Sequence, residues 1–485
     1  MTISIVRSDE SETIKTCDIE VISSDTITNL SRFQILDRGD KCFLQGNLEA
    51  ARKLYGEVKK PFQKTDNFAQ IKAATYEAEE LSPGGKKHWQ RYQKYREQSS
   101  QTSGMFISLF LLNDTDPNFI PGYLKLVELY KEYPEWCEYE GRVKTCQNRP
   151  KNALEVLEKA SNLYPNNGDL VTARIEEAVK HKKYLDASIA ARQFAIFNPD
   201  YPGIEKFSEM ADKYFDRYQS AKEGELALQT ALSCSADILT GNWSENFSGC
   251  GFALTLIKGE SAVGKLFAEK YKQKLSIVED EEVSKYVRGL AEPLIPLLGR
   301  DDFEYEFYVV RDNNLNAFAL PGGKIFVNTG AILGTNSQAE LAGLLGHEIS
   351  HSVLSHGFSR MATGNFLNSL GRVVPVENIF SLLLNKYSRS QEREADILGT
   401  RVLANAGYAA DGLRNFMVTV TKLEESNKTT TGTAFQAWES THPASAERVR
   451  YLERLIVNNG YNRYALEGVQ KHREIQNRIQ GHSKV

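Results

Sequence analysis

The polar and apolar positions of residues 337–357 repeat with the period of an α-helix. Apolar side chains recur every three or four positions and cover most of the helix surface. Ser337, followed three residues later by Glu340, is a capping-box pattern, and Gly357 is a typical residue just beyond a helix. We therefore expect a largely buried helix in this segment.

A second helix is predicted for residues 388–407, where Ser388 and Gln391 repeat the capping pattern and Gly407 marks the end. Just before the first helix, apolar residues alternate with period two on both sides of a Pro-Gly-Gly turn at residues 321–323. This alternation predicts a β-hairpin.

The first half of the chain has helical periodicity with an internal repeat of 34 residues. One set of positions recurs in the same order: Ala153, Leu157, Ala160 and Pro165, then Ala187, Ala191, Phe194 and Pro199. This period resembles tetratricopeptide repeats, and residues 46–51 resemble the start of another second helix. Most of the usual first-helix residues are absent, so a plain helical bundle is the alternative.

A chain of 485 residues is too long for one core. We expect a mainly α fold with a small β-sheet (α+β), in which an α-helical repeat array precedes a second domain that contains the hairpin and the two helices described above. The expected ranges are a repeat region at 1–235, a junction at 236–261, the second domain at 262–455 and a C-terminal tail at 456–485, the tail being a loosely held helix or disordered.

The first helix carries the sequence His347-Glu348-Ile-Ser-His351. Histidines four residues apart lie on one helix face, so both imidazoles reach a single tetrahedral metal. Glu348 lies beside them, placed to take a proton from a water at that metal. Buried histidines and a buried glutamate are costly unless something satisfies them, and a zinc ion is the simplest answer.

A zinc site needs a third protein ligand, either a histidine or a carboxylate. Glu392 and Asp396 on the second helix lie one turn apart, so Glu392 can bind the metal while Asp396 accepts from a ligand histidine. His356 is interpreted as helix-end polarity, and Glu394 as a solvated or salt-bridged residue. Taken alone, the segment is better explained as an ordinary charged helix with i,i+4 pairs.

These motifs together resemble the forty-eighth metallopeptidase family, the gluzincins typified by the CAAX prenyl proteases. The resemblance is greatest to its soluble or peripheral bacterial members and their mitochondrial inner-membrane relative. Two further segments match, namely residues 316–330 and Thr441-His442-Pro443 with Arg448 beyond them. The resemblance covers roughly residues 262–455 and implies a zincin-like metallopeptidase domain in this range. It implies one Zn²⁺ per chain on His347, His351 and Glu392, with Glu348 catalytic.

The resemblance also places His442 at the metal edge, either assisting the transition state or occupying the open metal position in a resting form. Arg448 is expected to face a substrate carbonyl or, with slight preference, a carboxylate inside the fold. The hairpin strand offers its backbone to an extended peptide, with the candidate substrate-binding residues Ala317, Phe318, Ala319 and Leu320. The equally weighted alternative is that the hairpin serves only as part of the domain core.

The composition argues against a nucleic-acid-binding protein and against a membrane-spanning one. The net charge of −4 gives no case for nucleic acid, and no apolar run reaches the roughly 18 residues of a membrane span. Residues 1–15 lack the apolar core of a signal peptide, and the six cysteines have no metal-binding spacing. We therefore expect a cytoplasmic protein with reduced thiols.

The function predicted from the sequence is a zinc endopeptidase in protein quality control, acting on protein or peptide substrates that include unfolded chains. The repeat region recruits or gates them. The alternative is a repeat-based scaffold or chaperone-like binding protein with a latent or inactive metallopeptidase domain.

Overall fold

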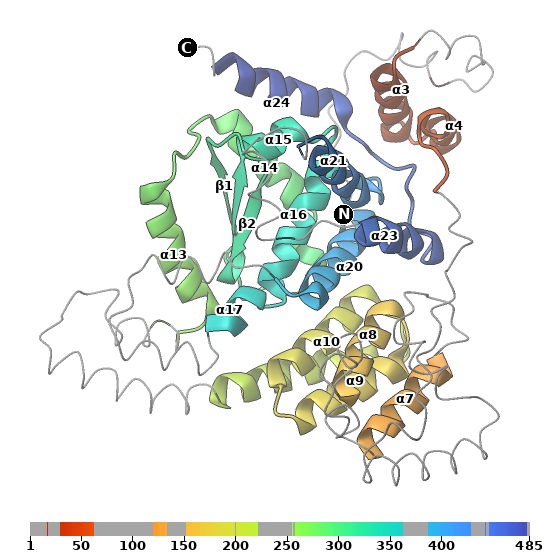
Figure 1. Cartoon of the computed structure of the whole chain (residues 1–485), viewed down its shortest axis with the longest axis vertical. Coiled ribbons are helices and arrows are strands. Elements are labelled where there is room, and N and C mark those ends of the chain that lie inside the picture. Colours follow the sequence, from red (N-terminus) through yellow and green to blue (C-terminus); the bar gives the residue numbers. More distant parts are fainter. Residues whose placement is uncertain are drawn as a thin grey trace, which may run out of the picture. The chain divides into compact units, whose positions relative to one another are not determined.

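The computed structural model describes most of the C-terminal half of the chain and several helical segments before it. The described residues are Cys17, 30–62, 120–132, 152–198, 200–221, Thr255, 258–361, 387–427, His442 and 446–482. The chain divides into two compact units, one formed by residues 1–62 and 222–485 and the other by residues 63–221. Figure 1 shows their elements.

The first unit is mostly helical. In chain order its elements are α3 (Arg32–Leu44), α4 (Leu48–Val58), α13 (Glu260–Lys274), α14 (Glu281–Ala291), η4 (Ile295–Leu297), β1 (Glu306–Val310), β2 (Ala317–Leu320), η5 (Pro321–Gly323), β3 (Lys324–Asn328), α15 (Thr329–Gly334), α16 (Gln338–Val353), α17 (His356–Met361), α20 (Arg389–Asn405), α21 (Gly412–Asn427), α23 (Ala446–Asn458) and α24 (Val469–His482). Among the described helices, none is long and apolar enough to cross a membrane.

The sheet of this unit has three strands in the order β1-β3-β2. β2 and β3 form the predicted antiparallel hairpin, and β1 pairs parallel with β3. The turn uses Gly322 and Gly323 at positive φ, where an L side chain is strained. The sheet lies between α13 and α16 (Figure 1), and Tyr271 of α13 packs against Phe318 and Phe326.

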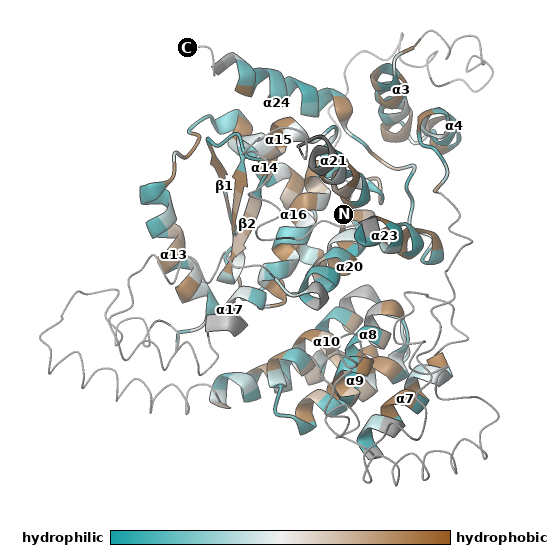
Figure 2. Ribbon diagram, in the orientation of Figure 1, coloured by the Kyte–Doolittle hydropathy of each residue, from teal (hydrophilic) through white to brown (hydrophobic). Residues whose placement is uncertain are grey.

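α16 is the central helix of the unit, and every residue from Ala339 to Val353 is buried. Its cap differs from the simple capping box: Ser337 accepts from the Glu340 amide, but the Glu340 carboxylate binds Asn336. Figure 2 shows apolar residues concentrated on the strands and on one part of α16. α20 begins with the predicted box, formed by Ser388 and Gln391.

The second unit contains α7 (Ile120–Glu132), α8 (Ala153–Leu163), α9 (Gly168–Lys180) and α10 (Tyr184–Phe197), and residues 204–221 are also helical. Consecutive helices pack on one another. The 34-residue shift relates α8 to α10, which is the spacing of a helix-pair repeat. The mainly helical class with a small sheet is therefore confirmed, whereas the tetratricopeptide assignment stays a prediction.

The N-terminal helices α3 and α4 belong to the unit of the sheet, although the sequence placed them with the repeats. Asp40 accepts hydrogen bonds from the Glu467 and Val469 amides. Lys59 is buried between Asp411 and Glu467, at 2.8 and 2.6 Å. Paired buried charges fix this packing, which a local helical pattern does not reveal.

Two further expectations change with the structure. Cys17 and Cys42 form a disulfide, so the expectation of reduced thiols is wrong for this pair. The segment expected to be a loose tail contains α24, which buries His472, Ile475 and Ile479. The expected junction at 236–261 lies almost wholly outside the described residues, and the predicted domain ranges stay a prediction.

Candidate metal centre

Helix α16 presents His347 and His351 on one face, as their spacing requires. Both side chains are fully buried, and their Nε2 atoms lie 3.1 Å apart. The burial lowers the pKa of both imidazoles, and the pKa of His351 lies well below its usual value. Both rings are therefore neutral at pH 7, the state in which imidazole binds a metal.

Helix α20 brings Glu392 to these two rings. Its two carboxylate oxygens lie 3.6 Å from the Nε2 atoms of His347 and His351. Close contact between the helices makes this possible, because a Cβ on Gly399 would fall 2.9 Å from the backbone nitrogen of His347. Glycine at that position allows the two backbones to touch.

His442 completes a group of four. Its Nδ1 atom lies 2.9 Å from Glu392 and 3.4 Å from Nε2 of His347. The ligand atoms of His347, His351, Glu392 and His442 all lie within 4.8 Å of one another, and all four residues are buried. Thr441 and Pro443, which completed the sequence motif, lie outside the described residues.

The charges of this group are strongly coupled. Burial by itself would raise the pKa of Glu392, but His442 and Arg448 outweigh it and lower that pKa to about 2. Burial would likewise lower the pKa of His442, but Glu392 and Glu348 outweigh it and raise that pKa. The two carboxylates thus favour the protonated form of His442.

Glu348 lies beside the group, fully buried. Burial raises its pKa to about 7. Neither carboxylate oxygen has a hydrogen-bond donor in good geometry among the described residues. The amide of Ala319 and Nε2 of His442, the latter at 3.4 Å, face the carboxylate. A buried carboxylate left in this way is suited to exchange a proton with a bound molecule.

Asp396 lies where the sequence places it, with Oδ1 2.9 Å from Nδ1 of His347. Arg448 binds this carboxylate through Nε and Nη2, at 2.8 and 2.7 Å, and reaches Glu392 through Nη1 at 2.8 Å. Arg448 is thus committed to carboxylates inside the fold, the option that the sequence favoured. Tyr451 also donates to Asp396, a contact with no sequence signal.

A second contact was missed at the sequence level. Nδ1 of His351 lies 2.8 Å from Nδ1 of His356, and Nε2 of His356 lies 3.1 Å from Glu394. We expected the helix to continue to Gly357, which would turn His356 away from the ligand face. α16 instead ends at Val353, and a new helix, α17, begins at His356. The turn between them brings the His356 ring to His351.

The candidate substrate-binding strand β2 lies at an edge of the described sheet and contacts α16. Ala317, Ala319 and Leu320 are buried, whereas Phe318 stacks on Phe326 with ring centres 5.0 Å apart. The hydroxyl of Ser352 donates to the Leu320 carbonyl and ties the strand to the metal-site helix. β2 is therefore held beside Glu348.

The four-residue group fits a zinc ion. Two neutral imidazoles and a carboxylate are a common zinc donor set, and a third imidazole suits the fourth tetrahedral position. The buried Glu348 beside them is the second partner that such a centre needs for hydrolysis.

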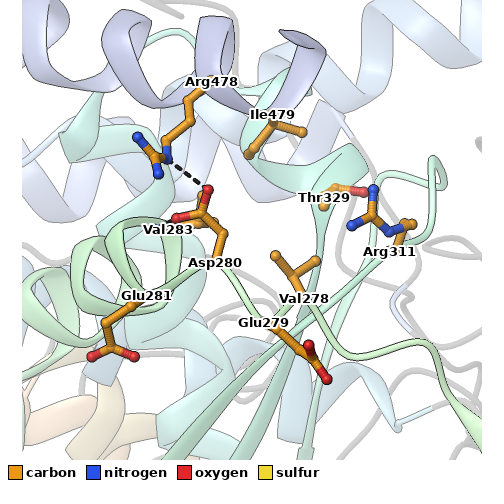
Figure 3. Close-up of a pocket in the computed structure, with 9 residues that line it drawn as sticks. All are labelled: Val278, Glu279, Asp280, Glu281, Val283, Arg311, Thr329, Arg478 and Ile479. Carbon is orange, nitrogen blue, oxygen red and sulfur yellow. Dashed lines mark hydrogen bonds and ion pairs between the residues drawn. The ribbon is translucent and has the colours of Figure 1, made fainter. Parts of the chain in front are cut away.

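A separate pocket in the same unit contains none of these residues. It lies by the N-terminus of α14 and the side of α24 and is lined by Val278, Glu279, Asp280, Glu281, Val283, Arg311, Thr329, Arg478 and Ile479 (Figure 3). Arg478 donates to Asp280 within it, at 2.6 Å. The pocket gives no chemistry that competes with the four-residue group.

Part of the chain matches a known family of metallopeptidases. Residues 281–456 match the sequence profile of Peptidase family M48, which confirms the resemblance that the four motifs predict. The range contains the described residues of the metal centre, from α16 to Arg448.

Individual relatives are metalloendopeptidases and proteases by name. The chain is 30% identical over 179 residues to mitochondrial metalloendopeptidase OMA1 of Schizosaccharomyces pombe, covering 35% of this chain and 51% of that protein. It is 32% identical over 178 residues to human mitochondrial metalloendopeptidase OMA1, covering 33% of each. It is 24% identical over 181 residues to the beta-barrel assembly-enhancing protease of Yersinia pestis, covering 33% of this chain and 37% of that protein. The chain thus spans about half or less of these relatives.

These comparisons contradict the cytoplasmic expectation, because several relatives are mitochondrial enzymes. The Cys17–Cys42 disulfide agrees with this correction, since disulfides rarely persist in the reducing cytosol.

Proposed function

We propose that this protein is a zinc-dependent endopeptidase. The observation that carries the proposal is the buried group of His347, His351, Glu392 and His442, with the Glu348 carboxylate 3.4 Å from His442. The M48 match and the names of the relatives support the same activity.

His347, His351 and Glu392 would hold the ion, and Asp396 would orient His347. When bound, zinc acts as a Lewis acid that polarises a peptide carbonyl and makes a water easier to deprotonate. Glu348 would take a proton from the attacking water, whose oxygen adds to the peptide carbonyl carbon, and would pass that proton to the amine nitrogen as the C–N bond breaks. Its raised pKa suits this exchange, because a general base works best when its pKa is near the working pH.

We propose that β2 binds the substrate by backbone pairing through residues 317–320. Strand addition reads main chain more than side chains, so extended and unfolded protein segments are the expected substrates. This selectivity suits a role in protein quality control. The helical second unit is the candidate for recruiting or gating those substrates, since stacked helix pairs form concave surfaces for peptides.

The competing proposal, a repeat scaffold with an inactive peptidase domain, has less support. A binding protein has no use for a buried glutamate beside four metal-binding groups, because the burial of Glu348 costs stability.

The test is the variant Glu348→Gln in the full chain. It should retain about one zinc per chain and lose casein cleavage, because the amide cannot accept the proton. Glu340→Gln, a buried glutamate on the same helix outside the metal centre, is the matched control and should keep its activity. Cleavage by Glu348→Gln at the wild-type rate would exclude the assignment.

The same variant serves as a substrate trap. Proteins that copurify with Glu348→Gln and are absent from wild type should be many different unfolded chains when identified by mass spectrometry. Recovery of one stoichiometric, folded partner would contradict the proposed substrate class.

A further inference from the structure

The two metal-binding histidines of α16 have different partners for their outer nitrogens. Nδ1 of His347 faces Asp396 directly, at 2.9 Å. Nδ1 of His351 faces another histidine, His356, at 2.8 Å, and that ring continues to Glu394 at 3.1 Å. Both paths thus end on a carboxylate of α20.

We propose that His356 and Glu394 are positioning residues that hold His351 in its metal-binding tautomer and orientation. The inference rests on the proposed function, because it concerns the same metal centre. It assigns a role to two residues that sequence reasoning had left outside the site.

The series of hydrogen bonds from His351 through His356 to Glu394, here called the relay, has one direction. That direction follows from which atoms can donate and which can accept. A carboxylate only accepts, so Nε2–H of His356 donates to Glu394. In a neutral imidazole, the other nitrogen is then an acceptor, and Nδ1 of His356 accepts from Nδ1–H of His351. The lone pair of His351 is left on Nε2, the atom that faces His347 and Glu392. This is the tautomer that a metal requires.

The turn between α16 and α17 is held in the conformation that brings His356 to His351. Ser355, between the two helices, has φ of 56°, a left-handed value that is uncommon for a residue with a side chain. Its hydroxyl donates to the buried Glu260 at 2.5 Å, and Arg300 donates to the Val353 carbonyl at 3.3 Å. The surroundings hold this turn, and the turn returns His356 to the face of His351.

The rings themselves are confined. His351 stacks on Tyr387 with centres 3.8 Å apart and meets His356 at an interplanar angle of 66°. His356 is buried, whereas the Glu394 side chain remains 19% exposed. Stacking limits tilting of the His351 ring, and the relay fixes its rotation. Together they keep Nε2 aimed at the metal position.

The arrangement also explains the spacing of acidic residues on α20. Glu392 is the ligand, Asp396 supports His347, and Glu394 supports His351 through His356. One helix therefore supplies the carboxylate ligand and both supports, so a shift of α20 would disturb all three.

The test measures zinc affinity of the full chain by competition with a chelator. His356→Leu keeps the bulk and removes both nitrogens, and should weaken zinc binding by about 10- to 100-fold, the usual cost of losing such a partner. His356→Asn places an acceptor oxygen near the position of Nδ1, so it should restore most of the affinity. Glu394→Ala should weaken binding less, because the His351–His356 bond survives.

The matched control is His472→Leu, which removes a buried histidine of the same unit that bonds Tyr286 and Thr335, away from the metal centre. It should lower the unfolding temperature and leave zinc affinity unchanged. A Co²⁺-substituted protein gives a second signature: its visible absorption should change in His356→Leu and return towards wild type in His356→Asn.

The outcomes separate the two claims. Absence of zinc from wild type would overturn the proposed function, and the relay with it. Tight zinc binding by wild type and equally by His356→Leu would overturn the relay alone, as would an equal loss in His472→Leu. Should His356→Leu fail to fold, Glu394→Ala decides: reduced affinity supports the relay, and wild-type affinity refutes it.

Discussion

His442 Nδ1 lies 2.9 Å from Glu392 Oε1, inside the group that is expected to bind the metal. Catalytic zinc sites have three protein ligands and one open position, whereas closed sites have four. A histidine in the fourth position would therefore close the centre of the resting enzyme.

We expect low basal activity and a rise of at least severalfold in the variant His442→Ala, because three ligands remain and the fourth position opens. The measurement is the initial rate of cleavage of an unfolded protein at equal zinc content. A severalfold fall would instead assign His442 to stabilising the transition state, and an unchanged rate would make it structural.

Removing the carboxylate ligand should remove the metal. Glu392→Ala is expected to lose most of its zinc after dialysis, because it removes one ligand and also the carboxylate that holds His442 at 2.9 Å beside the site. Metal content by atomic emission checks this. Glu453→Ala, which breaks a partly buried pair with Arg414 elsewhere, is the control and should keep its zinc. Stoichiometric zinc in Glu392→Ala would make His442 the third ligand.

Removing the charge of Asp396, which supports His347, should weaken zinc binding less than removing the ligand Glu392. Asp396→Asn keeps the shape of the side chain but removes its charge, so zinc affinity should fall by about 10- to 100-fold. Chelator competition measures this loss. An affinity equal to wild type would show that Asp396 serves only the packing of Arg448 and Tyr451.

Lys59 should anchor the N-terminal helices. Lys59→Ala leaves Asp411 and Glu467 buried without their cation and should cost about 3–5 kcal/mol of unfolding free energy. Lys41→Ala removes a half-exposed lysine from its pair with Asp37 and should cost less than about 1 kcal/mol. Urea unfolding compares the two variants, and equal costs would contradict the buried anchor.

The unfolding free energy should depend on pH through the buried carboxyl group of Glu340. Burial raises its pKa to about 7, with Glu467 and Asp411 contributing. Because this folded value exceeds the unfolded one, the stabilising contribution is complete below about pH 4.5 and is lost as pH rises through about 7. Glu340→Gln should thus gain stability over wild type between pH 5 and pH 8, by up to roughly 3 kcal/mol. Unfolding curves at the two pH values test this, and a pH-independent difference would contradict it.

Local patterns in the sequence predicted the elements that carry the chemistry. The capping residues Ser337 and Ser388, the Pro-Gly-Gly turn and the spacing of His347 and His351 depend on neighbours within a few positions. Such short-range rules fix a helix face or a hairpin whatever else the chain does. The one-turn spacing of Glu392 and Asp396 pointed to a ligand and its partner, and the likeness of the motifs to a known family then supported Glu392 and added His442.

Only the tertiary structure decided which distant groups meet. The turn at Ser355 depends on Glu260 and Arg300, so nothing near His356 in the sequence revealed its contact with His351. The place of α3 and α4 depends on pairs such as Lys59 with Asp411, and the Cys17–Cys42 bond joins residues 25 positions apart. These relationships arise from packing between segments far apart in the chain, and periodicity along one segment carries no record of them.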